Sequence, residues 1–229
     1  MIMMYSDFPT EKGASNLLRR VFSWMTLALA ITGATAWGVA NYPPALMFIF
    51  QNPMIIFLLF FGQLGLVIYL SLRIQTMSYQ AAMTSFLGYA FLNGLTFASI
   101  FLVYTHESIA LVFFLCSAMF AAMTLYGYFT RADLSSMGSI LFMGLIGLII
   151  SLFINMFLRS TQFDLLISMA GIAIFTLLTA YDVQQIKRLG QQLPGAPLSK
   201  VAILGALKLY LDFINLFLYL VRFFGQKRN

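Results

Sequence analysis

Seven long apolar runs alternate with short polar segments along the chain. They lie at residues 21–40, 54–72, 81–104, 109–129, 134–158, 165–186 and 201–224. Each run is close to the ~20 residues that an α-helix needs to cross a hydrocarbon core of ~30 Å. Unpaired backbone groups are too costly in lipid, and the alternation typical of a β-barrel is missing, so each run is predicted to be helical. The pattern predicts an all-α membrane protein with seven transmembrane helices.

The segments between the runs are short and contain turn residues, so neighbouring helices are expected to be antiparallel. This divides the chain into an N-terminal segment (residues 1–20), a seven-helix transmembrane domain (21–225) and a short basic tail (226–229). The first apolar run has no small-residue cleavage site after it. It is therefore expected to be a retained span and not a signal peptide.

The composition supports a membrane protein and excludes several soluble classes. Of the 229 residues, 61% are hydrophobic and 9% are charged, whereas a soluble domain has roughly 25% charged residues. The net charge of +6 comes from Lys and Arg at span ends, which indicates membrane orientation and no nucleic-acid partner. Cys116 is the only cysteine, which excludes an intrachain disulfide and a multi-cysteine zinc site.

Basic residues are distributed unequally between the two sides of the membrane. The N-terminal segment and the connections after spans two, four and six contain Lys12, Arg19, Arg20, Arg73, Arg131, Lys187, Arg188 and Lys200. The opposite connections contain Arg159 alone, which predicts a cytoplasmic N-terminus. The chain is expected to be a multi-pass protein of the inner (plasma) membrane. Seven full crossings leave Lys227 and Arg228 outside. The alternative is a last segment that re-enters, and seven crossings are preferred.

Two carboxylates lie at membrane depth, where each costs about 2.5 to 3.5 kcal/mol on insertion scales. Asp182 lies about one turn before the end of span six, so it is either a functional residue or an interfacial one that reaches water. Asp212 lies near the middle of span seven, where its side chain cannot reach the surface. Both are candidate functional residues.

Span seven also has a polar stripe. Its members are Lys208, Asp212, Asn215, Tyr219 and Arg222, separated by 4, 3, 4 and 3 residues. This spacing places them on one face of a helix, which must be turned to the bundle interior or to a water-filled cavity. The alternative to a functional role is a structural seam in which Lys208 neutralises Asp212 one turn later.

The two aspartates are expected in the same half of the membrane, because the chain enters span seven from the side on which span six ends. If their carboxyl groups meet, they share one proton. Loss of that proton leaves two like charges, whose repulsion separates the helices or recruits a cation. Asp182 and Asp212 would then form a weak, transient calcium site, since calcium prefers six to eight oxygen ligands.

The segments around these residues resemble the signature of a known family. The two segments are Tyr181-Asp182-Val183-Gln184 and Leu209-Tyr210-Leu211-Asp212-Phe213-Ile214-Asn215-Leu216-Phe217. They resemble those of the Bax inhibitor-1 family, also called the transmembrane Bax inhibitor motif family, and the short connections are similar to those of its bacterial members. The resemblance implies seven helices with the last one central, and a pH-sensitive calcium leak.

By the same resemblance, Asp182 and Asp212 are the proton-sharing pair that governs opening. An arginine near the end of span two, which closes the pore on the aspartates, corresponds to Arg73. Lys208 departs from the family pattern, and a cation at that position would favour the ionised form of Asp212. Calcium is thus the permeating ion, and no resident cofactor is expected.

Two other functions remain open. Some bacterial relatives modulate an ATP-dependent membrane protease, so this chain is alternatively a regulator that binds such a protease. An intramembrane aspartyl protease is less favoured, because Leu209-Tyr210-Leu211-Asp212 replaces the Gly-x-Gly-Asp segment of that class. The chain has no phosphate-binding glycine loop, which argues against an ATP-driven pump. The preferred hypothesis is a passive, non-enzymatic protein in contact with calcium ions, protons and the lipid bilayer.

Overall fold

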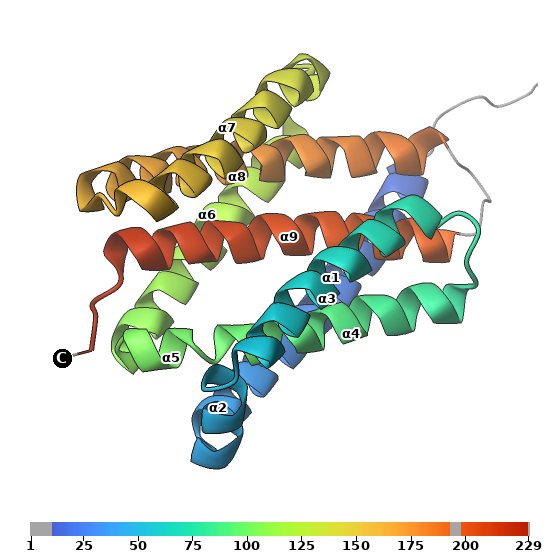
Figure 1. Cartoon of the computed structure of the whole chain (residues 1–229). Coiled ribbons are helices and arrows are strands. Elements are labelled where there is room, and N and C mark those ends of the chain that lie inside the picture. The colour runs from blue at the N-terminus through green and yellow to red at the C-terminus, as the bar shows by residue number, and fades with distance from the viewer. Residues whose placement is uncertain (1–10, 193–197, 229) are drawn as a thin grey trace, which may run out of the picture.

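The structure is a computed structural model that describes residues 11–192 and 198–228 (Figure 1). Predictions for residues 1–10, for the connection 193–197 and for Asn229 lie outside the described residues. The elements are α1 (Glu11–Ala40), α2 (Pro43–Phe50), α3 (Pro53–Arg73), α4 (Tyr79–Phe97), α5 (Ile100–Val103), α6 (His106–Phe129), η1 (Leu134–Ser136), α7 (Met137–Leu158), α8 (Thr161–Gln192) and α9 (Leu198–Phe224).

Within the described residues, seven helical segments are long and apolar enough to cross a membrane, which confirms the prediction of an all-α protein with seven spans. The third span consists of α4 and α5, with a break at Ala98 and Ser99. The Ser99 hydroxyl donates to the carbonyl oxygen of Thr96 at 2.8 Å, a local bond that competes with the regular helix ladder. α1 and α8 are both longer than the apolar runs that predicted them.

The short helix α2 was not predicted, because it lies between the first two apolar runs, in a segment interpreted as a connection. Pro43 stands in the first turn of α2 and Pro53 in the first turn of α3. Proline suits this position because its missing N–H would have no partner there. Asn52 caps α3, since its Oδ1 accepts from the Met54 amide at 3.1 Å. The two prolines therefore start two helices.

α9 packs against α1, α4, α6 and α8, and most of its residues are buried. In contrast, α3 and α7 have few buried residues and present large apolar side chains outward, among them Phe57, Phe60, Phe153 and Phe157. Such surfaces suit contact with lipid tails, where apolar side chains have no need of protein cover. Figure 1 shows α9 running alongside α8, with α1 and α4 on its other side.

Long-range hydrogen bonds show which connections lie beside each end of α9. At the end that we call the basic end, Lys200 Nζ donates to the carbonyl oxygens of Gln75 and Met77, at 2.9 and 3.2 Å. At the opposite end, which we call the tail end, the Thr105 amide donates to the carbonyl oxygen of Gln226 at 3.0 Å. α9 thus connects opposite ends of the bundle, which agrees with seven full crossings and not with a re-entrant last segment.

Candidate functional site

The two aspartates lie in the interface between α8 and α9, which are antiparallel and in extensive contact. Asp182 is 8% exposed and Asp212 is 5% exposed. Oδ2 of Asp212 is buried and has no hydrogen-bond partner among the described residues. Asp182 contacts Lys208, which lies one turn before Asp212 on α9, so the structure brings Asp182 to the part of α9 that holds Asp212.

Lys208 contributes a cation to this site. Its Nζ lies 3.5 Å from Oδ1 of Asp182, and its side chain is 48% exposed. Asp212 follows one turn later on the same face of α9. The sequence-based alternative had Lys208 neutralising Asp212 within the same helix, whereas the ion pair in the structure is made across the interface with Asp182. Two carboxyl groups and one ammonium group therefore form a single cluster that joins α8 to α9.

The rest of the polar stripe follows the same interface toward the tail end. Tyr219 stacks on Phe175 of α8, with ring centroids 5.8 Å apart. Arg222 forms a second ion pair, 3.5 Å from Oδ1 of Asp164 on α8. Asn215 turns its amide back onto its own helix and donates to the carbonyl oxygen of Leu211 at 2.8 Å. Asp212 and Tyr219 are buried, Asn215 is half-buried, and Lys208 and Arg222 are exposed, so the stripe lies along the edge of the α8–α9 interface.

Sequence reasoning missed Asp164, although the sequence contains a signal for it. Asp164 and Asp182 are 18 residues apart, which is five turns at 3.6 residues per turn, so they lie on one face of α8. A small residue between them permits close contact of the helices. A Cβ added to Gly171 would lie 2.6 Å from the ring of Tyr219, so only glycine leaves space for this aromatic ring.

Arg73 lies apart from this cluster. It ends α3 and is exposed, and α3 packs mainly against α2 and α4. The ion pairs formed by residues 11–192 and 198–228 do not include Arg73. The cation beside the aspartates in this structure is Lys208, and the role of Arg73 as a latch stays a prediction.

The basic end of α8 is fixed to the connection between α6 and α7. The side-chain amide of Gln184 accepts from the Leu134 amide at 2.9 Å and donates to the carbonyl oxygen of Ala132 at 2.8 Å. Asp133 lies 2.7 Å from Arg188. The Ser135 amide and the Arg188 guanidinium together lower the pKa of Asp133 to about 2. These contacts fix the position of α8 around Asp182.

A cleft of about 390 Å³ between α8 and α9 leads to the cluster. Its lining includes Tyr181, Gln185, Arg188 and Lys208, so polar groups surround its opening. The described residues include no group of three or more His, Cys, Asp or Glu side chains suited to a metal ion. The site therefore offers two carboxyl groups to a proton or to a weakly held cation.

Known proteins are similar in sequence to this chain along almost its whole length. A family model described as "Inhibitor of apoptosis-promoting Bax1" matches residues 14–229. The chain is 43% identical over 219 residues to the inner membrane protein YbhL of Escherichia coli, covering 94% of each chain. It is 42% identical to an uncharacterized protein of Borreliella burgdorferi, again covering 94% of each chain. An uncharacterized protein of Rickettsia prowazekii is 41% identical, over 96% of this chain and 93% of the relative.

These matches confirm the resemblance that was based on the segments around Asp182 and Asp212. The relative in Escherichia coli is named as an inner membrane protein, and the part of this chain that the structure describes has seven helices long and apolar enough to span a membrane. Together these findings support a multi-pass inner membrane protein. The chain belongs to the Bax inhibitor family described as "Inhibitor of apoptosis-promoting Bax1", and it resembles the bacterial members of that family.

Proposed function

We propose that this protein is a pH-sensitive leak for calcium ions, in which Asp182 and Asp212 share a proton and control opening. The observation that carries this proposal is the buried Oδ2 of Asp212, which has no hydrogen-bond partner among the described residues. An unsatisfied buried polar atom costs about 1–3 kcal/mol, and more when the group is charged. A residue that weakens the fold in this way suits a functional role better than a structural one.

The proton state of the cluster provides the switch. With one proton shared, the cluster has one negative carboxylate and one positive lysine, and the α8–α9 interface is electrostatically balanced. Without that proton, a second negative charge lies in a poorly solvated interface, and repulsion between the carboxylates favours separation of the helices. The same charge attracts a calcium ion from the cleft lined by Tyr181 and Lys208.

Weak binding is suited to a leak. Two carboxylates with water and backbone oxygens supply fewer ligands than the six to eight that calcium prefers, so the ion is released readily. Flow is driven by the concentration gradient alone, because the sequence has no phosphate-binding loop. Calcium is the transported ion in this proposal, and the protein performs no covalent chemistry. The distribution of Lys and Arg further supports an orientation with the N-terminus in the cytoplasm.

The test is calcium flux into liposomes containing the purified full chain, measured against pH. The parent protein is expected to show flux that changes with pH, and Asp182→Asn and Asp212→Asn are each expected to abolish or displace this dependence. Asp164→Asn is the matched control, because it removes a carboxylate from the same face of α8 at the tail end. Parental flux at every pH in both variants of the pair would refute the proposal.

A further inference from the structure

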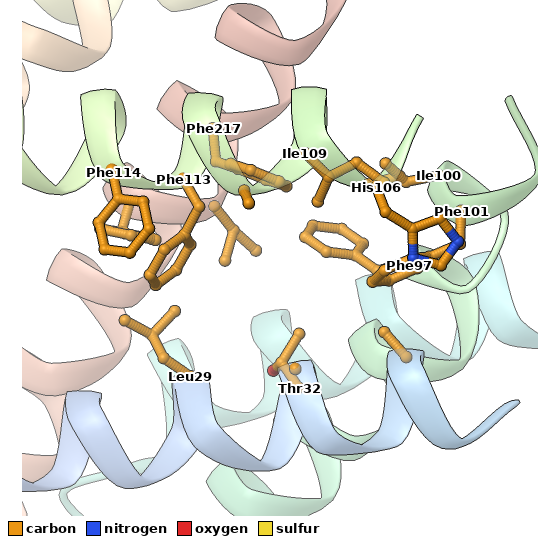
Figure 2. Close-up of a pocket in the computed structure, with 15 residues that line it drawn as sticks. Leu29, Thr32, Phe97, Ile100, Phe101, His106, Ile109, Phe113, Phe114 and Phe217 are labelled. Atoms are coloured by element: carbon orange, nitrogen blue, oxygen red, sulfur yellow. The ribbon is translucent and has the colours of Figure 1, made fainter. Parts of the chain in front are cut away.

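A second cavity lies on the opposite side of α9 from the charged cluster. It measures about 290 Å³ and lies between α1 and α6, in the half of the bundle near the tail end. Figure 2 shows Leu29 and Thr32 of α1 pointing across the space toward Phe113 and Phe114 of α6. We call this cavity the α1–α6 slot.

The floor of the slot is formed by α9, through Phe213, Ile214 and Phe217. α1 and α6 each pack against α9, so the slot is a lateral opening through which the otherwise buried last helix is reached from the membrane. Gly33 lines the slot on α1, and a Cβ added there would meet no atom within 4 Å. Phe114 at the α6 side is largely exposed, which leaves the mouth open toward lipid.

Water is a poor occupant for this space. The surface of the slot is almost entirely apolar, and a buried water molecule needs two to four polar partners. The Thr32 hydroxyl, a polar group on the wall, is already engaged by the Tyr210 hydroxyl at 2.7 Å and by the carbonyl oxygen of Ala90 at 2.9 Å. An empty slot would leave its aromatic rings without packing partners on one side.

Basic groups lie at the polar end of the slot. His106 lies at this end, with its ring 5.6 Å from that of Phe101. The basic tail is held beside it, because the Arg228 amide donates to the carbonyl oxygen of Val103 at 2.8 Å and Lys227 forms a backbone bridge with Tyr104. Lys and Arg side chains bind phosphate groups through charge-assisted hydrogen bonds.

We infer that the α1–α6 slot binds one acyl chain of a phospholipid whose phosphate lies beside His106 and the basic tail. Because the slot lies within the membrane spans, its mouth faces the hydrocarbon of the bilayer. The positive charges of the basic tail complement the negative phosphate. A volume of about 290 Å³ is at the lower limit of ligand pockets, which suits part of one chain and not a larger molecule. This inference does not depend on the proposed function.

The test uses photolabelling of the full chain in vesicles of phosphatidylethanolamine and phosphatidylglycerol. A trace phospholipid with a diazirine in its acyl chain is activated by light, and labelled residues are identified by mass spectrometry. The parent is expected to be labelled at Phe213 and Phe217 more strongly than at Phe57, which is on the lipid-facing helix α3. Equal labelling would mean contact with bulk lipid only and would overturn the inference.

Substitution of Gly33 provides the second arm. Gly33→Phe fills the slot and is expected to lower labelling of α9 about tenfold, the factor that corresponds to about 1.4 kcal/mol. Gly38→Phe is the matched control on the same helix, because its Cβ also meets open space but it does not line the slot. Should Gly33→Phe fail to fold, Ala110→Phe blocks the slot from α6. Parental labelling of α9 in a folded slot-filling variant would overturn the inference.

Discussion

The lysine in the aspartate cluster provides a quantitative test of the proposed switch. Lys208→Met removes the ammonium group that lies 3.5 Å from Asp182 and keeps an unbranched side chain of similar length. The ammonium group favours the doubly ionised state of the two carboxyl groups. Without it, the pair is expected to retain its shared proton to a higher pH, so the midpoint of calcium flux against pH moves upward.

The size of this shift follows from the geometry of the pair. Two unit charges 3.5 Å apart attract by about 5 kcal/mol at an effective dielectric constant of ~20. The Lys208 side chain is about half exposed, and exposed pairs contribute only ~0.2–1 kcal/mol because solvent screens them. The Asp182 side chain is 11% exposed, so we take the upper limit of about 1 kcal/mol. At 1.36 kcal/mol per pH unit, this gives a shift of about 0.7 unit.

The assay is the same liposome flux measurement, taken at closely spaced pH values. Lys208→Arg retains the positive charge and is the matched control, with a midpoint expected near that of the parent. A parental midpoint in Lys208→Met, together with a displaced midpoint in Asp182→Asn, would refute the reasoning. It would mean that Lys208 is screened too strongly to influence the pair.

Two further predictions concern the packing of α8. Gly127→Ala places a Cβ 2.9 Å from the Cα of Ala180 and is expected to cost about 1–3 kcal/mol of stability. The measurement is a lower melting temperature in detergent. Gly147→Ala is the control: its Cβ meets open space, so this variant should melt like the parent. Asp133→Asn should lower the melting temperature equally from pH 5 to 8. Because its pKa falls to about 2 in the folded protein, the stabilisation by Asp133 is lost only as the pH drops from about 4 through 2, where the difference should vanish.

The number and positions of the spans could be predicted from the sequence, because crossing a bilayer demands a length and composition that few other structures need. The ends of the helices could not be predicted from the sequence. α8 continues past residue 186 because Gln184 and Arg188 bind the connection between α6 and α7, a tertiary contact that hydropathy does not record. The helix α2 was missed because it begins with Pro43 and Pro44, and proline is typical of turns as well as of the first turn of a helix.

The polar stripe of α9 was predicted because helical periodicity depends only on spacing within one segment. Its partners depend on how α8 lies against α9, which the sequence of α9 does not contain. Lys208 was therefore given a partner on its own helix, Asp212, whereas it pairs with Asp182 across the interface. For the same reason, the ion pair between Arg222 and Asp164 was not anticipated.

The two faces of α9 have a joint consequence. One face holds the carboxyl groups, and the other forms the floor of the α1–α6 slot. The single rod formed by α9 therefore exchanges protons on one side and contacts hydrocarbon on the other. Any rotation or displacement of this rod alters both surfaces at once. Thermodynamic linkage then requires reciprocity: a lipid that prefers one position of the rod shifts the acid response, and acid alters the affinity for that lipid by the same factor.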